Sequence, residues 1–165
     1  MTYPVSVTCR QIMNGNPPVL HRNDSIGQAV ELLLAHRCLA LPVIDDDRRY
    51  LGMFAKSRLF GLMLPAIVAL EEVLPNMARV TDLSYLSDDI SDLRTRFGEL
   101  RERPVGQYAD ANVPKVRPDS PLMEAILLVY RTRNFLPVVE RDTNRLAGVI
   151  STWDILTKLG ENKNV

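Results

Sequence analysis

The chain has 165 residues, which at roughly 150 residues per domain corresponds to one compact domain or two very small ones. Hydrophobic residues make up 46% and charged residues 24% of the chain, a composition typical of a globular domain rather than of a disordered or collagen-like chain. The 20 Lys and Arg residues balance the 20 Asp and Glu residues, so no overall positive field favours nucleic acid or an anionic membrane. The composition therefore excludes a large multidomain enzyme and disfavours a nucleic-acid partner.

The cysteines and the hydropathy pattern bear on the compartment. Cys9 and Cys38 show neither the spacing of a redox motif nor a secretory leader in front of them. The most apolar stretch, residues 59–70, has 12 residues and includes Pro65, whereas a membrane-spanning helix needs about 20 apolar residues. These features predict reduced thiols, no membrane span and a cytoplasmic location.

The first half of the chain predicts a helix followed by two strands. Asp24 and Ser25 are candidate caps for a helix with apolar residues at a 3.6-residue spacing. Those apolar residues are Ile26, Ala29, Val30, Leu33 and Leu34. Residues 41–44 and 50–54 are mainly apolar and are separated by a polar turn, which predicts a β-hairpin. A second helix is expected to start near Lys56.

The second half repeats this order at an offset of 95 to 96 residues. Asp119 and Ser120 again precede a helical pattern. Its apolar face consists of Leu122, Ala125, Ile126, Val129 and Tyr130. The strands predicted at 136–139 and 146–150 repeat the Leu-Pro-Val sequence and the central glycine of the first pair. Because the sequence offset is nearly the same for a helix and two strands, it indicates a true internal duplication.

Each repeat is preceded by a short lead-in that is expected to be extended. We assign residues 7–64 to the first repeat and residues 103–161 to the second. A unit of about 60 residues is too small to be comfortably stable alone. The two repeats are therefore expected to pack on each other as one body.

The segment between the repeats, residues 65–102, contains two further helical patterns. One ends at Pro75, and the other follows a cap at residues 87–89. The apolar positions of the second pattern are Ile90, Leu93, Phe97 and Leu100. We expect a packed helical insertion, whose apolar face either packs between the repeats or contacts a second copy of the chain.

Two copies of strand, helix, Leu-Pro-Val strand, glycine-containing strand and helix resemble a tandem pair of cystathionine-beta-synthase-type (CBS) domains, or Bateman module. The most specific match is Gly-Val-Ile-Ser-Thr-Trp-Asp at residues 148–154. The resemblance implies an α+β fold with pseudo-two-fold symmetry between the repeats. It also implies a regulatory sensor, not an enzyme, that binds AMP, ADP, ATP or S-adenosylmethionine in the cleft between the repeats. A homodimer acting on an unidentified protein target is expected on the same ground.

Three residues of the motif are candidate ligand contacts. Ser151 and Thr152 lie at a predicted helix start, where hydroxyls and free backbone amides can bind a phosphate or ribose oxygen. Asp154 can accept hydrogen bonds from both ribose hydroxyls, and such charge-assisted bonds are worth roughly 1.5–3 kcal/mol each. The pattern therefore favours a nucleoside over a free base.

The resemblance also implies ligand contacts outside the motif. Two apolar segments are expected to lie on either side of an adenine ring, and two residues just before a predicted strand are expected to contact a phosphate. The residues in question are Val113 and Pro114 for one wall, Pro137 and Val138 for the other, and Arg133 and Asn134 for the phosphate.

The same motif also has a purely structural interpretation. Ser-x-x-Asp before an apolar run is close to a capping box, worth about 1 kcal/mol to the helix without any ligand. Capping and ribose binding can coexist, and the duplicated framework favours a ligand site. If the motif only caps the helix, the protein is a ligand-free dimerisation or protein-interaction scaffold, and this alternative stays open.

The first repeat departs from the pattern, because Ala55 and Arg58 stand where Ser or Thr and Asp are expected. It cannot make the ribose contacts, which predicts one competent site and one that is degenerate or adapted. Lys56 and Arg58 either reach the phosphates of a nucleotide or are solvated surface cations.

No catalytic or metal site is predicted. The usual catalytic motifs do not occur, and His21 and His36 lie far apart in the sequence, both as expected surface residues. Cys38 is interpreted as a small buried hydrophobe, although its neighbour Arg37 could lower the pKa of its thiol. Trp153 is interpreted as a packing residue that could also report ligand binding by its fluorescence.

Overall fold

The computed structural model describes residues 7–64, 89–132 and 135–161, and within them it is a mixed α+β structure with two small sheets. The helices are α1 (Ile26–His36), α2 (Lys56–Met63), α4 (Ile90–Leu100), α5 (Leu122–Thr132) and α6 (Thr152–Gly160), with short 3-10 turns at Cys9–Gln11 and Val105–Gln107. The strands are β1 (Leu20–His21), β2 (Ala40–Ile44), β3 (Tyr50–Ala55), β4 (Leu136–Val139) and β5 (Leu146–Ile150). Among the described residues, no helix is long and apolar enough to span a bilayer.

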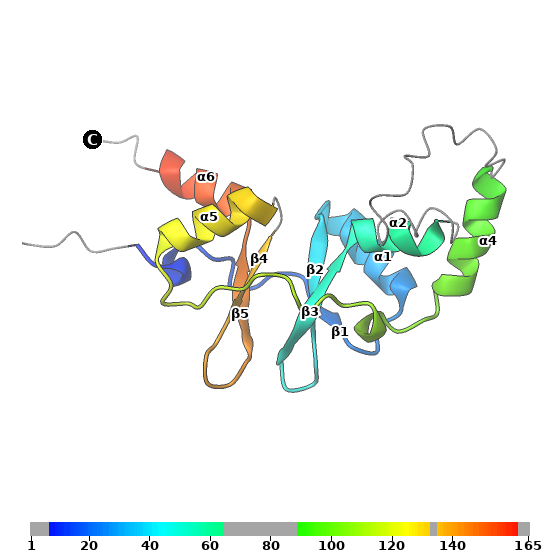
Figure 1. The fold of residues 1–165 in the computed structure, drawn as a ribbon, viewed down its shortest axis with the longest axis horizontal. Helices are drawn as coiled ribbons and strands as arrows, with labels where there is room; N and C mark the ends of the chain where they lie inside the picture. The colour runs from blue at the N-terminus through cyan, green and yellow to red at the C-terminus, as the bar shows by residue number, and fades with distance from the viewer. Residues whose placement is uncertain (1–6, 65–88, 133–134, 162–165) are drawn as a thin grey trace, which may run out of the picture.

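The two predicted hairpins are confirmed and lie side by side (Figure 1). In the first sheet β1 runs parallel to β2, which pairs antiparallel with β3. In the second sheet β4 pairs antiparallel with β5. The hairpin turns bond to each other across the repeats: the Tyr50 N–H donates to the Asn144 carbonyl at 2.9 Å, and the Leu146 N–H donates to the Arg48 carbonyl at 3.0 Å.

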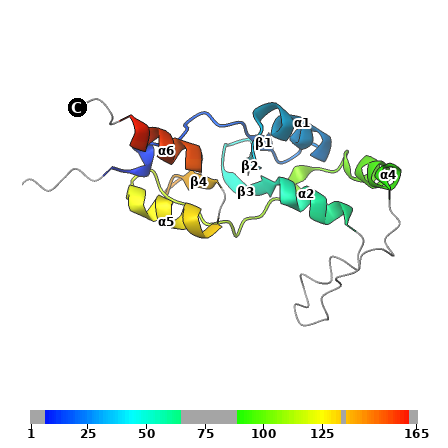
Figure 2. The ribbon, with the colours of Figure 1, turned by 90° about the horizontal axis from the view of Figure 1, so that it is seen from above.

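The helices lie at the ends of the hairpins opposite the turns (Figure 1). Seen from above, α6 and α1 lie along one side and α5 and α2 along the other (Figure 2). Each side therefore combines one helix from each repeat. This is the pseudo-two-fold arrangement that the duplication predicts.

Each repeat completes its core with the lead-in of the other. We call residues 8–19 the first arm and residues 104–115 the second arm. Cys9 and Ile12 of the first arm pack in the core of the second repeat, whereas Val105 of the second arm packs in the core of the first repeat. The repeats defined by the sequence are therefore not self-contained packing units.

Backbone bridges hold the exchanged arms in place. Asn14 of the first arm pairs with Val149 of β5, and Asp110 of the second arm pairs with Met53 of β3. In each pair both N–H groups donate to the carbonyl of the partner, over distances of 2.8 to 3.1 Å. Each arm therefore lies against the glycine-containing strand of the opposite repeat.

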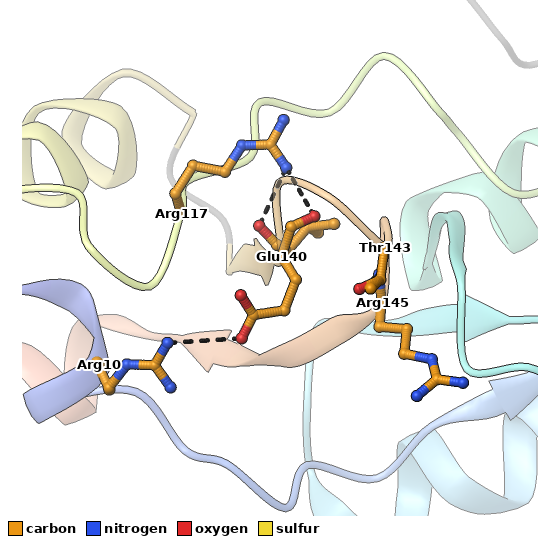
Figure 3. Close-up of polar contacts among 6 residues, drawn as sticks. Arg10, Arg117, Glu140, Thr143 and Arg145 are labelled. Carbon is orange, nitrogen blue, oxygen red and sulfur yellow. Dashed lines mark hydrogen bonds and ion pairs between the residues drawn. The ribbon is translucent and has the colours of Figure 1, made fainter.

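Two arginines tie the arms to the second hairpin (Figure 3). Arg117, just beyond the second arm, donates from Nη1 to the carbonyls of Val139 and Glu140, at 3.0 and 3.2 Å. Arg10 of the first arm forms an ion pair with the Glu140 carboxylate at 3.5 Å. Because both members of that pair are exposed, its contribution to stability is small, about 0–1 kcal/mol.

The helix caps largely follow the sequence. Ser25 caps α1, and its side chain forms a capping box with Gln28. Asp89 caps α4 by accepting from the Ser91 and Asp92 amides, and the hydrogen bonds to Ser91 and Asp92 lower the pKa of this carboxyl. Ala55 precedes α2 and provides no side-chain cap.

Two residues of the predicted apolar helix faces are exposed in the structure. Leu34 of α1 is 73% exposed and Tyr130 of α5 is 80% exposed. Leu34 directly follows the buried Leu33, and Tyr130 directly follows the buried Val129. Adjacent residues lie about 100° apart on a helix, so the buried faces are narrower than the apolar patterns.

The insertion packs in part on the first repeat. Leu100 belongs to the first core and Phe97 packs against it, while Arg96 Nη1 donates to the Met63 carbonyl at 3.1 Å. Ile90 and Leu93 are exposed. The helix that the sequence predicts to end at Pro75 lies outside the described residues.

Candidate functional site: two cavities between the repeats

The start of α6 carries a fully formed capping box. The backbone N–H and the hydroxyl of Ser151 each donate to Oδ2 of Asp154 at 2.6 Å. In return, the Asp154 N–H donates to Oγ of Ser151 at 3.3 Å. The structural interpretation of the motif is thus confirmed, and the Ser151 hydroxyl is engaged within the protein rather than aimed at a ligand.

The capping box leaves ligand-binding capacity at the same helix start. Within the described residues, Oδ1 of Asp154 accepts no hydrogen bond, and the backbone amide of Trp153 has no acceptor. Oδ1 can therefore accept from a hydroxyl, while the Trp153 amide, at the positive end of the helix dipole, can donate to an oxygen. Capping and ligand binding are compatible in this geometry.

This helix start opens onto a cavity of about 630 Å³, which we call the first cavity. Its wall combines the first arm, the end of α1, the start of β2 and the start of α6, together with single residues from β3, β5 and the approach to β4. The residues are Asn14, Pro17, Pro18, His36, Arg37, Cys38, Leu39, Ala40, Leu41, Pro42, Met53, Phe135, Val149, Ser151, Thr152, Trp153 and Asp154. The volume is in the range of small-molecule sites, about 300–1,000 Å³.

The end of α1 brings positive charge to the first cavity. Arg37, the C-cap residue, has φ 49° and ψ 35°, a left-handed conformation that is uncommon for a residue other than glycine. Its guanidinium forms no ion pair within the part of the chain that the structure describes, and the exposed His36 lies beside it. The first cavity thus has a carboxylate at one helix start and a guanidinium at another helix end.

A second cavity, of about 670 Å³, lies at the start of α2. It is the pseudo-symmetric counterpart of the first and is formed mainly by the second arm and α2. Its lining residues are Ala40, Met53, Ala55, Ser57, Arg58, Gly61, Tyr108, Ala109, Asp110, Ala111, Asn112, Val113 and Phe135.

The structure distributes the predicted site residues differently from the sequence analysis. Ser151, Thr152 and Asp154 lie together in the first cavity, but Val113 lines the second cavity. Pro114 lines neither. The structure does not bring all of these residues to one cavity, because the exchanged arms carry Pro17 and Pro18, not Val113 and Pro114, to the cavity at the start of α6.

Pro137 and Val138 also do not line the first cavity. Both are buried, Val138 completely, within the second repeat. In the first repeat, the counterpart of Pro137 is Pro42, which lines the first cavity. The counterpart of Val138 is Val43, which does not. The apolar lining of the first cavity thus comes from both repeats, but not from Pro137 or Val138.

The predicted phosphate contacts Arg133 and Asn134 lie outside the described residues. At the offset of 96 residues, however, Arg133 corresponds to Arg37, which lines the first cavity. Sequence reasoning assigned Arg37 no contact with the ligand. The internal duplication would have predicted this contact, because Arg37 in the first repeat is the counterpart of Arg133, the phosphate contact predicted in the second repeat.

Other side chains also differ from expectation. Trp153 is 76% exposed and lines the first cavity, so its assignment as a packing residue is wrong. Cys38 is half-buried, and burial raises the pKa of its thiol despite the adjacent Arg37. His21 and His36 are exposed, as predicted. Within the described ranges, no group of three or more His, Cys, Asp or Glu side chains is placed to hold a metal ion.

Two repeats that exchange their arms and enclose paired cavities define a tandem-repeat module. The sequence matches the CBS domain profile twice, at residues 9–64 and 105–161. The chain therefore belongs to the CBS domain family, as a tandem pair. A comparison with curated protein sequences found no significant match.

Solved structures share this fold at low sequence identity. CBSX2 from Arabidopsis thaliana is 21% identical with a TM-score of 0.71, and the match covers 98% of this chain and 100% of that chain. CBSX2 in complex with AMP is 22% identical with a TM-score of 0.66, over 95% and 98% of the two chains. The CBS domain pair of MJ0100, in complex with 5'-methylthioadenosine and S-adenosyl-L-methionine, is 18% identical with a TM-score of 0.60, over 96% and 99%.

Proposed function

We propose that this protein is a regulatory sensor module that binds an adenosine-containing ligand in the first cavity. The observation that carries the proposal is Asp154, which lines a cavity of about 630 Å³, is fixed by the capping box with Ser151, and has an Oδ1 that accepts no hydrogen bond from the described residues. A fixed carboxylate oxygen suits a ribose hydroxyl, because it accepts without first having to be ordered.

The remaining walls suit the other parts of a nucleotide. Leu41, Pro42 and the exposed ring of Trp153 provide apolar surface for adenine. Arg37 and His36 provide donors for a phosphate. This combination favours AMP, ADP or ATP, while S-adenosylmethionine shares the adenosine part. CBSX2 and the MJ0100 domain pair, which have the same fold, bind AMP and S-adenosyl-L-methionine respectively.

Regulation would follow from the position of the cavity between the repeats. A ligand that contacts both repeats stabilises the relative orientation to which it binds more tightly. At a hundredfold excess over Kd, binding stabilises that state by about 2.7 kcal/mol. The proposal assigns no catalysis to the module and has it act on a protein target, in the cytoplasm that its two unpaired cysteines favour.

The proposal includes a homodimer formed through exposed apolar rows on two helices. The row on α5 consists of Met123, Leu127 and Tyr130, and the row on α6 consists of Leu156 and Leu159. Each row follows a helical spacing of three or four residues, which presents a continuous apolar strip. A second copy with the same rows can cover them symmetrically.

A calorimetric and thermal-shift series with AMP, ADP, ATP, adenosine and S-adenosylmethionine tests the function. We expect at least one adenosine-containing ligand to bind at one site per chain and to raise the melting temperature. If none of them binds at millimolar concentration, the sensor proposal is wrong. The complete capping box and the exposed apolar rows then favour the alternative function of a ligand-free dimerisation scaffold.

A further inference from the structure

Two equivalent arginines lie where the hairpin turns of the repeats meet. Arg49 and Arg145, which correspond to each other at the offset of 96 residues, form an antiparallel backbone bridge between the repeats. We call residues 48–50 and 144–146 the seam. The two hydrogen bonds that join the turns flank this bridge, so Arg49 and Arg145 are a non-hydrogen-bonded pair, the kind in which opposite side chains lie closest.

The seam therefore places two like charges directly opposite each other, an arrangement that destabilises paired strands. Both arginines are exposed. Arg49 has one carboxylate nearby, that of Asp47 at 3.6 Å, whereas Arg145 forms no ion pair in the part of the chain that the structure describes. The Arg145 side chain extends away from the ion pair of Arg10 and Glu140 (Figure 3). The fold thus neutralises at most one of the two opposed guanidiniums.

A third arginine of the seam has an unfavourable backbone conformation. Arg48 has φ 61°, and its counterpart in the second repeat, Asn144, has φ 55°. Asparagine adopts this left-handed region readily, whereas arginine does so rarely. The Arg48 side chain is exposed and forms no ion pair with any described residue. An asparagine would suit the first turn better, so the turn geometry does not explain this arginine.

Carboxylates border the seam but do not lie within it. Asp45 holds the first turn, since its Oδ1 accepts from the N–H groups of Asp47 and Arg49, each at 2.9 Å. Asp46 and Asp142 are exposed, one in each turn. The seam itself contains three arginines and no acidic residue. It is therefore a short cationic surface between two turns that carry negative charge.

We propose that the seam binds an acidic segment of a partner protein, with carboxylates on Arg49 of one repeat and Arg145 of the other and with Arg48 beside them. Guanidinium groups match carboxylates because each can donate two parallel hydrogen bonds. The acidic turns limit the surface to a short segment and repel a long polyphosphate chain such as nucleic acid.

The seam lies apart from the ligand site. It is at the turns of the hairpins, opposite the helices (Figure 1), and neither Arg49 nor Arg145 lines a cavity. Because its contacts come from both repeats, a partner bound there would respond to their relative orientation. The proposal goes beyond the adenosine site and does not require it.

The test measures binding of a fluorescein-labelled hexaglutamate peptide to the full-length chain by fluorescence anisotropy at low salt. No nucleotide is present, so the result does not depend on the adenosine site. We expect the parent to bind, and Arg49→Gln with Arg145→Gln to weaken binding by about tenfold or more, as loss of two charge-assisted contacts implies. The matched control, Arg94→Gln with Arg131→Gln, removes two charges from exposed positions on α4 and α5 and is expected to change the affinity by less than about threefold.

Arg48→Asn separates peptide contact from turn geometry. Because asparagine suits the left-handed position, this variant is expected to melt at a higher temperature than the parent and yet to bind the peptide more weakly. Arg145→Gln is also expected to raise the melting temperature at low salt, and the gain is expected to shrink at about 1 M salt, which screens the repulsion from Arg49. Unchanged peptide affinity in Arg48→Asn would overturn the role given to Arg48.

Three results overturn the proposal as a whole. One is the absence of peptide binding by the parent at millimolar concentration. Another is equal peptide affinity in the seam variant and the control variant, because net charge would then be recognised and not the seam. The third is binding of hexathymidylate at least as tightly as the peptide, with the same loss in the seam variant, because the seam would then serve a nucleic acid. Circular dichroism checks that each variant is folded, as expected for changes at exposed side chains.

Discussion

Asn14 and Val149 exchange a pair of backbone hydrogen bonds across the two repeats, with N···O distances of 2.9 and 3.1 Å. Met53 and Asp110 form the equivalent pair, at 3.0 and 2.8 Å. Each pair fixes an arm of one repeat on the glycine-containing strand of the other. Both cavities consequently have walls from both repeats, so a ligand in either one links its binding to the relative orientation of the repeats.

Gly148 permits this close approach. A Cβ at this position would overlap the carbonyl oxygen of Asn14 and lie 3.2 Å from Sδ of Met13. We expect Gly148→Ala to lower the free energy of unfolding by about 1–3 kcal/mol, the usual effect of overpacking, as measured by urea denaturation. Gly98→Ala is the control, since its Cβ would meet no atom within 4 Å. An equal loss in both variants would contradict the arm exchange.

Asp154 and Gln28 hold the same capping-box position in α6 and α1, but only Asp154 lines the first cavity. Asp154→Ala is expected to weaken adenosine-nucleotide binding at least about tenfold, or about 1.4 kcal/mol, in a calorimetric titration. Gln28→Ala removes a comparable cap and is expected to leave the affinity unchanged. Similar losses in the two variants would show that the effect comes from helix stability and not from ligand contact.

Arg37 is expected to select ligands that carry a phosphate. Arg37→Ala should reduce the preference for AMP over adenosine by about tenfold, because one charge-assisted contact is lost, as measured by the ratio of the two Kd values. Arg48→Ala is the matched control: Arg48 is also exposed and left-handed, with φ 61°, but it lies in a hairpin turn outside the cavity. An unchanged preference in Arg37→Ala would place the phosphate elsewhere.

The buried thiol of Cys9 is expected to make the free energy of unfolding depend on pH in the alkaline range. Burial raises the pKa of its thiol from 9.0 to about 11, with smaller contributions from Glu124 and Asp119. Between these values the unfolded state loses the proton while the folded state keeps it, so the free energy of unfolding falls as pH rises from about 9 to about 11. Below pH 9 this group has no such effect.

The measurement compares the parent chain with Cys9→Ala by urea denaturation from pH 8 to pH 11. Other groups that titrate in this range are common to both proteins, so the difference isolates Cys9. We expect the stability of the parent to fall more steeply. Identical pH profiles would contradict the assignment of a buried, neutral thiol.

The apolar rows on α5 and α6 are expected to form the homodimer. Leu127→Glu together with Leu156→Glu should convert a dimer into a folded monomer in sedimentation experiments, because buried charge at an interface is costly. Ile90→Glu is the control, since Ile90 is 64% exposed on α4, outside both rows. Dissociation by Ile90→Glu alone would assign the interface to the insertion instead.

The sequence by itself determined the elements and their duplication. The capping boxes of α1 and α6, the two hairpins and the uncapped start of α2 all follow from residues within a few positions of one another, such as Ser25 with Gln28 and Ser151 with Asp154. Local hydrogen bonds and side-chain periodicity arise from neighbouring residues, so one copy of the sequence is enough to predict them.

The tertiary structure alone decided how the walls of each cavity are shared. Val113, predicted to share a site with Ser151, lines the second cavity together with Arg58, and Arg37, for which no ligand contact is predicted, lines the first cavity together with Asp154. These placements depend on pairings between residues far apart in the sequence, such as Asn14 with Val149 and Met53 with Asp110. Periodicity predicts which side of an element is apolar. It does not predict which of two similar repeats an arm will pack against. In this protein the arms pack in the core of the opposite repeat, and this packing decides the composition of each cavity wall.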